Sequence, residues 1–143
     1  MDAIDRRIIQ ILQTDGKASF QEIATAVSLS APAAFQRVRK LEASGVISGY
    51  HAKVDPAAVG RAVLAFVQVV PPAGADTGAL ARQWKGIPAI LECHRVSGLD
   101  RFLLKVRIAT HSELSGFADA LRGAGCGVHT ELALATEFER WTT

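Results

Sequence analysis

The first third of the chain carries apolar positions that recur with the period of an amphipathic helix. Within residues 2–14, isoleucine and leucine stand at i, i+4, i+7 and i+8, which predicts a first helix. A second, short helix is predicted over residues 19–27, because Ser19 followed three residues later by Glu22 forms a capping box ahead of further apolar positions.

A third helix is predicted to begin at Ser30, whose hydroxyl can cap the free backbone amides of the first turn, and to end before Gly45. Its apolar residues follow helical spacing and form a buried stripe of Ala34, Val38 and Leu41. Only a tight link separates it from the second helix. Three short helices joined in this way predict a helix-turn-helix unit.

After residue 60 the hydrophobic period changes from 3.6 to two residues, as in strands, and is interrupted twice by helices. Residues 46–54 are predicted to be extended, as a wing would be, and residues 55–60 a linker, so we place a helix-turn-helix domain over 1–60 and a second domain over 61–143. The second domain is predicted to hold strands and helices in the order βαββαβ, at about residues 62–70, 76–85, 90–96, 102–108, 114–121 and 128–135. The fold class is therefore α+β: a winged helix-turn-helix followed by a ferredoxin-like βαββαβ domain.

Composition and charge limit the possible partners. With 49% hydrophobic and 21% charged residues, the chain can bury a core. Sixteen Lys plus Arg against fourteen Asp plus Glu give a net charge of +2, which excludes a polycation, so any nucleic-acid surface must be local. The start of the chain lacks a signal-peptide pattern and no apolar run is long enough for a membrane helix, so we expect a cytoplasmic protein that does not contact membranes.

The polar side of the third helix is the strongest candidate site. Guanidinium and amide groups can bind guanine and adenine edges in the major groove, whereas Arg39 and Lys40 near the helix end are better placed for phosphates. Further phosphate contacts are expected at the starts of the second and third helices. The predicted DNA-binding residues are Ser19, Gln21, Ser30, Ala33, Gln36, Arg37, Arg39 and Lys40. The alternative is an ordinary solvated helix face, which the preceding capped helix and the short turn make less favourable.

The second domain shows no catalytic set, metal site or cofactor motif. Cys93 and His94 are adjacent, so on a strand they point to opposite faces and cannot form a thiol–base pair. Cys126 and His129 supply only two ligands, which do not make a metal site. The sequence therefore predicts a protein that is not an enzyme and needs no cofactor.

The whole chain resembles the Lrp/AsnC, or feast/famine, family of transcriptional regulators. The resemblance rests on residues 5–12, 15–17, 30–42 and 45–47 in the first domain, and on residues 92–98 followed by 102–106 in the second. It implies a homodimer formed through the second domains, assembling further to octamers, that binds double-stranded DNA and responds to a small effector such as an amino acid.

The resemblance also implies where the effector binds: between dimers, near the hairpin turn and the last strand. The residues expected there are Gly98, Leu99, Asp100, Arg101, Thr130 and Leu132. The chain departs from the family pattern, since Arg101 stands where an aspartate is usual. Asp100 and Arg101 could bind the ammonium and carboxylate of an amino acid, or they could form a surface turn in a pocket that has lost this specificity.

Two other functions fit the same architecture. Siroheme decarboxylases resemble these regulators, but their site goes with His, Arg and aromatic residues on the strands after the hairpin, whereas residues 101–105 read Arg-Phe-Leu-Leu-Lys. A ligand-sensing module that no longer binds DNA is the other alternative, and the basic residues of the third helix argue against it. The sequence thus favours a sequence-specific DNA-binding regulator.

Overall fold

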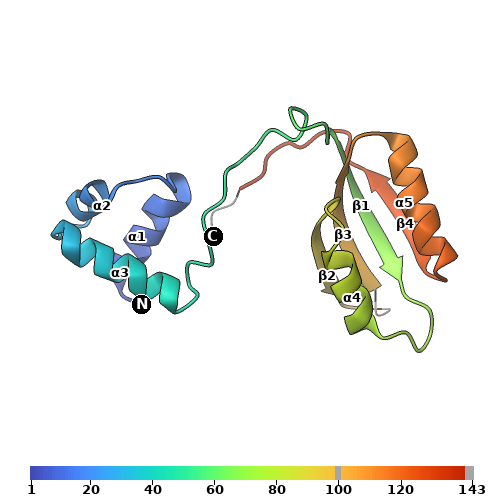
Figure 1. Ribbon diagram of the computed structural model, residues 1–143, viewed down its shortest axis with the longest axis horizontal. Helices are drawn as coiled ribbons and strands as arrows, with labels where there is room; N and C mark the ends of the chain where they lie inside the picture. Colours follow the sequence, from blue (N-terminus) through green and yellow to red (C-terminus); the bar gives the residue numbers. More distant parts are fainter. Residues whose placement is uncertain (99–100, 141–143) are drawn as a thin grey trace. The chain divides into compact units, whose positions relative to one another are not determined.

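The computed structural model describes residues 1–98 and 101–140 and divides the chain into two compact units (Figure 1). The N-terminal unit comprises Met1–Lys53 together with the chain from Phe138 onward, and the C-terminal unit comprises Val54–Glu137. The boundary expected at residue 60 lies within the irregular segment between the last helix of the first unit and the first strand of the second.

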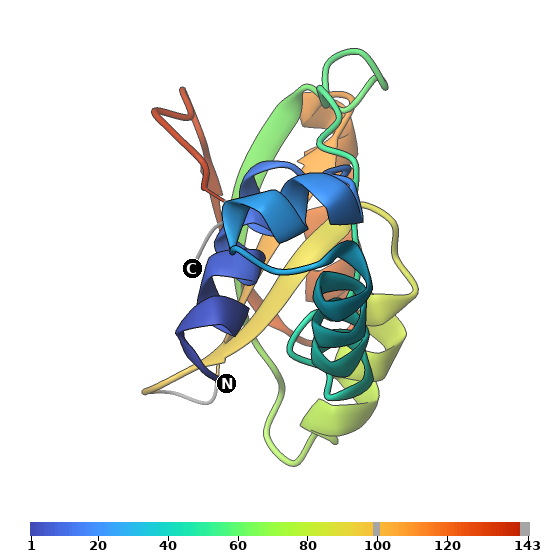
Figure 2. The same cartoon turned by 90° about the vertical axis from the view of Figure 1, so that its left-hand side faces the viewer.

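The N-terminal unit is a bundle of three helices, α1 (Ala3–Thr14), α2 (Phe20–Ala26) and α3 (Ala31–Ala43), which Figure 2 turns toward the viewer. Each helix begins where a side chain can accept from a free backbone amide: Asp2, Ser19 and Ser30 are the three N-caps. The apolar stripes meet in one core, made of Ile8, Ile23, Ala24, Ala34, Val38 and Leu41. This confirms the predicted helix-turn-helix unit.

No strand is assigned between α3 and the first strand of the second unit, where the chain is described throughout. The extended segment expected over residues 46–54 is irregular, so the winged part of the predicted fold has no hairpin here.

The C-terminal unit has the predicted βαββαβ order, with six elements. They are β1 (Val63–Val70), α4 (Thr77–Lys85), β2 (Ile90–Val96), β3 (Arg101–Ile108), α5 (His111–Gly123) and β4 (Gly127–Leu132). The strands form one antiparallel sheet in the order β2-β3-β1-β4, so the first and third strands lie at its centre. β4 ends at Leu132, three residues before the predicted end of the last strand.

The sheet has one face covered by α4 and α5 and one open face. Alternation along β3 places Phe102, Leu104, Val106 and Ile108 in the core under the helices. The intervening side chains, with their partners on neighbouring strands, point to the opposite side. We call this opposite side the open face; it carries Leu64, Phe66, Gln68, Val70, Glu92, His94, Val96, Arg101, Leu103, Lys105, Arg107, His129 and Glu131.

Candidate functional site

The exposed side of α3 carries three polar side chains that are accessible to a partner. Gln36, Arg39 and Lys40 are all exposed, and they lie opposite the buried stripe of the helix. The guanidinium of Arg39 lies over the Phe35 ring at 5.3 Å from its centroid and within 3.3 Å of Glu42, so it is partly oriented although 65% of its side chain is exposed.

The predicted phosphate contacts at the helix starts act first as caps. The Ser19 hydroxyl accepts from the backbone N–H of Glu22 and donates to its carboxylate at 2.7 Å, and Ser30 accepts from the N–H of Ala33 at 3.4 Å. Ser19, Gln21 and Ser30 remain exposed, whereas Ala33 is half-buried. A cap that is also exposed leaves the neighbouring helix amides near the surface, where a phosphate can approach.

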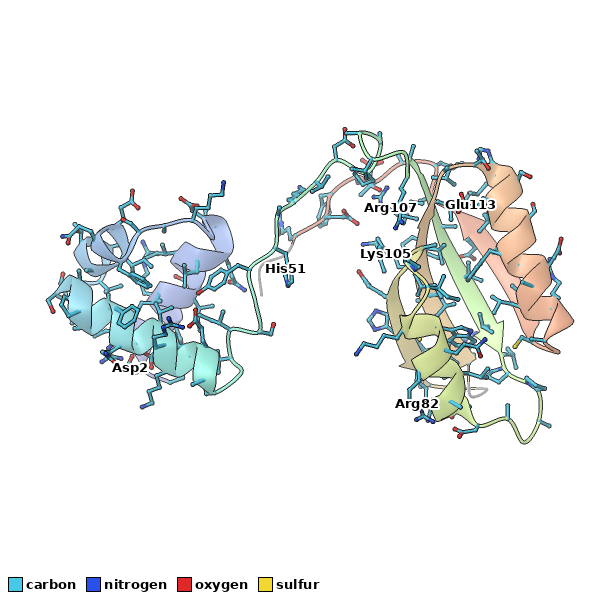
Figure 3. The ribbon with its side chains drawn as sticks, viewed as in Figure 1. Asp2, His51, Arg82, Lys105, Arg107 and Glu113 are labelled. Carbon is cyan, nitrogen blue, oxygen red and sulfur yellow. The ribbon has the colours of Figure 1, made fainter. Side chains whose placement is uncertain are left out.

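Arg37 is half-buried and is less accessible than the other polar residues predicted on this side of α3. Arg37 flanks the buried stripe and reaches α1, where its Nη1 atom lies 2.7 Å from a carboxylate oxygen of Asp2 and 2.7 Å from one of Asp5. Figure 3 shows Asp2 beside α3. These two ion pairs leave no signal in the local pattern, because Arg37 lies more than thirty positions away from both carboxylates in the chain.

Tyr50 is a second contact that the periodicity did not reveal. Its hydroxyl donates to Glu42 at 3.0 Å, and its ring lies against the turn at Gly16. Burial, followed by the nearby Glu42 carboxylate, raises the pKa of Tyr50. The segment that leaves α3 is therefore attached to the side of the helix next to Arg39.

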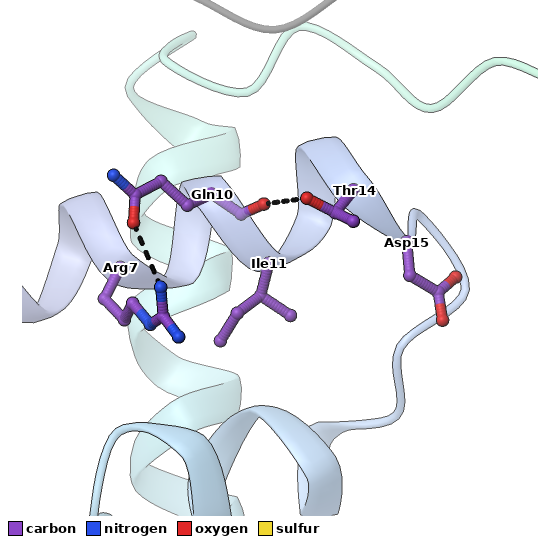
Figure 4. A pocket seen from close by; sticks show the side chains of 5 residues that line it. All are labelled: Arg7, Gln10, Ile11, Thr14 and Asp15. Carbon is purple, nitrogen blue, oxygen red and sulfur yellow. Dashed lines mark hydrogen bonds between the residues drawn. The ribbon is translucent and has the colours of Figure 1, made fainter.

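A shallow pocket of about 290 Å³ lies along α1 (Figure 4). Its lining is Arg7, Gln10, Ile11, Thr14 and Asp15. Arg7 donates to the Gln10 side chain at 3.3 Å and Thr14 to the Gln10 carbonyl at 2.9 Å, so most of its polar groups already have partners. Among the described residues, none of those predicted for DNA or effector binding lines this pocket.

The predicted effector residues are spread over the two faces of the sheet. Leu99 and Asp100 lie outside the described residues. Gly98 has φ +106°, a backbone conformation that favours glycine and supports the predicted turn. Arg101 lies on the open face, where its guanidinium donates to Gln68 at 3.3 Å, and its Nε atom is buried without a hydrogen-bond partner.

Thr130 and Leu132 point to the other side. They pair with Val67 and Ala65, whose side chains are buried under the helices, so their own side chains lie on the helix-covered face. The described residues of a single chain therefore do not bring Arg101 together with Thr130 and Leu132.

The described residues give little support for a metal site or a reactive cysteine. The described residues contain no group of three His, Cys, Asp or Glu side chains that could hold a metal ion. Cys93 is exposed and Cys126 buried, both are free, and burial raises the pKa of each thiol. No helix within the described part is long and apolar enough to cross a membrane.

Comparison with known proteins gives the same division into two parts. Residues 1–42 match the family model of the AsnC-type helix-turn-helix domain, and residues 63–138 match that of the Lrp/AsnC ligand binding domain. Among curated relatives, the HTH-type transcriptional regulator FL11 of Pyrococcus horikoshii is 36% identical over 141 residues, covering 97% of this chain and 93% of that protein.

A second relative, the HTH-type transcriptional regulator LrpA of Mycobacterium tuberculosis, is 34% identical over 122 residues and covers 85% of this chain and 81% of its own length. Among solved structures, a feast or famine regulatory protein from M. tuberculosis complexed with L-methionine superposes with a TM-score of 0.91. That chain is 33% identical, and the match covers 99% of this chain and 97% of that one.

Proposed function

Because the chain belongs to the Lrp/AsnC family of transcriptional regulators, we propose that it binds double-stranded DNA with the exposed side of α3. The observation that carries this proposal is the accessibility of Gln36, Arg39 and Lys40 on the helix that follows the turn. An amide can bind an adenine edge, and the two cations can neutralise phosphates on either side of a major groove. Ser19, Gln21 and Ser30 would add contacts at the helix starts.

The experiment separates base contacts from phosphate contacts on DNA selected from a random pool with the wild-type chain. Lys40→Ala is expected to weaken binding to selected and scrambled duplexes equally and to reduce the slope of log K against log salt by about one unit. Gln36→Ala is expected to relax base preference with the slope unchanged. Lys85→Ala, which removes an exposed cation from the C-terminal unit, is the matched control. An unchanged slope in Lys40→Ala would contradict the proposed contact.

We further propose that the C-terminal unit binds an amino acid near the hairpin turn and β4. The proposal is supported by the match to the ligand binding domain and by the L-methionine complex of a related protein. Since Arg101 lies on the opposite sheet face from Thr130 and Leu132, a complete pocket would need residues from a second copy. Calorimetric titration of the full chain with L-methionine and the other proteinogenic amino acids tests this, and no heat with any of them would contradict it.

We propose that the protein is a homodimer formed through the open face of the sheet, and that dimers assemble to an octamer. The open face combines the apolar side chains of Phe66, Val70 and Leu103 with charged side chains, some of which have partners on the same face. Lys105 lies 3.3 Å from Glu92, and the His94 contact, followed by that of Lys105, lowers the pKa of Glu92. Charges neutralised in this way cost less to bury.

The curated relatives are transcriptional regulators, in agreement with a protein that is not an enzyme. We propose that the chain has no catalytic activity and works in the cytoplasm, where its DNA would be. A siroheme decarboxylase activity has no specific support in the site, and a module without DNA binding would leave the exposed cations of α3 without a role.

A further inference from the structure

The start of α1 and the middle of α3 are joined by a cluster of three charged side chains, Asp2, Asp5 and Arg37. Asp2 caps α1: one of its carboxylate oxygens accepts from the backbone N–H of Asp5 at 2.8 Å. Asp5 returns the contact, accepting from the backbone N–H of Asp2 at 3.0 Å. Each carboxylate therefore uses one oxygen for the reciprocal cap and keeps the other free.

Both remaining oxygens accept from the same nitrogen of Arg37. The distances from Arg37 Nη1 to Asp2 Oδ2 and to Asp5 Oδ1 are both 2.7 Å, which is short for charge-assisted hydrogen bonds. The side chains of Asp5 and Arg37 are 16% and 32% exposed, against 52% for Asp2. Asp5 is therefore the more enclosed partner, and Asp2 closes the cluster on its solvent side.

These contacts hold Arg37 away from the exposed side of α3. Successive residues turn by about 100° around a helix, so Arg37 lies on the flank of α3, between the buried stripe of Ala34, Val38 and Leu41 and the exposed Lys40. The guanidinium bridges α1 and α3, whose buried residues Ile8 and Val38 belong to the same core. The two bonds therefore add a direct link between the start of α1 and the middle of α3.

We infer that Arg37 is a positioning residue for DNA recognition, which orients α3 through Asp5 and Asp2 and does not read bases itself. The inference rests on the proposed DNA contacts of α3 and concerns how that helix is held. It also assigns a role to Asp5, a carboxylate that could only repel the phosphates of bound DNA. In this arrangement one acidic side chain of α1 is needed for tight binding of an anionic ligand.

That consequence gives a test, because a positioning role of Arg37 and a direct contact of Arg37 with a base predict different results for Asp5→Asn. The full chain and its variants are titrated with a short duplex selected from random DNA by the wild type and with a scrambled duplex. Arg37→Ala and Asp5→Asn are each expected to lower the ratio of selected to scrambled affinity about fivefold. The double variant should be no worse than either single one, because both remove the same bond.

A direct base contact would behave differently. Arg37→Ala would then lower the ratio, while Asp5→Asn would leave it unchanged or raise affinity by removing a negative charge; either result for Asp5→Asn overturns the inference. Arg37→Lys distinguishes the readings again, since one ammonium can donate to both carboxylates but cannot form the bidentate contact of a guanidinium with guanine. Near wild-type selectivity is expected for Arg37→Lys.

Measurements of stability separate a loss of folded protein from a loss of selectivity for DNA. Thermal melts and circular dichroism establish that each variant is folded at the titration temperature, and a loss of folded protein lowers both affinities without changing their ratio. Where Arg37→Ala does not fold, Asp2→Asn keeps the experiment decisive, because asparagine still caps α1 while the charge is lost. Asp15→Asn, at the other end of α1, is the matched control and should leave the ratio unchanged. Failure of Lys40→Ala to change the salt slope would count against the DNA interface itself, and not against the role of Arg37.

Discussion

Three carboxyl groups at the helix starts of the N-terminal unit have lowered pKa values. The carboxyl groups of Asp2 and Asp5 have lowered pKa values, first because each accepts from the other's backbone N–H and then because of the hydrogen bond from Arg37. Glu22 has a lowered pKa for the same first reason, through the backbone N–H of Ser19. All three carboxyl groups accept these hydrogen bonds best when they are ionised. All three also lie at the start of a helix, where the helix dipole favours a negative charge.

The stability of the N-terminal unit is therefore expected to depend on pH at the acid end. A carboxyl whose pKa is lower in the folded than in the unfolded protein stabilises the fold above its unfolded value, here 3.8 for Asp5, and this contribution is lost as pH falls through the folded value. Thermal melts between pH 7 and about pH 2 should show a smaller loss of stability in Asp5→Asn than in wild type. Equal pH dependence in the two proteins would contradict this assignment.

Helices of the N-terminal unit differ in how firmly they begin. Ser19 makes three contacts with Glu22: its backbone N–H and its hydroxyl each donate to the carboxylate at 2.7 Å, and the hydroxyl accepts from the backbone N–H of Glu22 at 3.2 Å. Ser30 makes one contact, at 3.4 Å. α2 is also the shortest helix of the unit, with seven residues, so it depends more on its cap.

We expect Ser19→Ala to destabilise the protein by about 1–2 kcal/mol and Ser30→Ala by about 0.5 kcal/mol. Chemical denaturation followed by circular dichroism measures both, and each variant serves as the control for the other. The reverse order would show that the length of the cap contact does not decide its contribution.

The segment that follows α3 depends on one side chain for its attachment. Tyr50→Phe removes only the hydroxyl that donates to Glu42 and leaves the ring against Gly16. The expected cost is about 0.5–1.5 kcal/mol of stability, the usual net value of such a hydrogen bond. Because Glu42 would then interact only with Arg39 on this side, a somewhat weaker affinity for any DNA should accompany the change. Glu42→Gln, which frees Arg39, should act in the opposite direction on affinity.

The elements themselves could be predicted from the sequence, whereas the faces of those elements could be predicted only in part. Helical spacing and capping residues located all three N-terminal helices, because caps and stripes are local properties. Counting by three and four placed Arg37 with Ala33, Gln36 and Lys40. A helix turns by about 100° per residue, so such a row drifts around the helix, and its members at 33 and 37 lie on the half-buried flank.

The face of the sheet to which a side chain points was also predicted only in part. On β3 the prediction was correct, because every second residue of this strand is apolar and buried. On β4 the alternation is weak, so the sequence did not show that Thr130 and Leu132 face the helices while Arg101 faces away. The long-range bonds of Arg37 to Asp2 and Asp5 leave no periodic signal at all.

At the scale of the whole molecule, the open face is a feature that a single chain leaves unexplained. It places Phe66 and Leu103 on the two central strands of a four-stranded sheet, and the described helices of the C-terminal unit cover the opposite side. Arg107 and Lys105 line the same side of β3 (Figure 3). Central apolar residues surrounded by polar and charged ones are the composition expected of an interface between subunits.

Charge introduced at the centre of that face should therefore prevent dimerisation. Leu103→Asp is expected to convert the assembled protein to monomers, because a carboxylate buried between two sheets would lack a partner and the same substitution meets itself in a symmetric dimer. Sedimentation velocity on the full chain measures the change in mass. Phe66→Asp should behave alike, since it lies on the neighbouring central strand.

Ala120→Asp, on the exposed side of α5, is the control and should not dissociate a dimer formed through the sheet. Loss of the dimer should also lower affinity for a DNA site with two half-sites far more than for a single half-site, since two recognition helices joined in one particle bind with a high effective concentration. If Leu103→Asp keeps the wild-type mass while Ala120→Asp loses it, subunits meet through the helices, and the open face must have another partner.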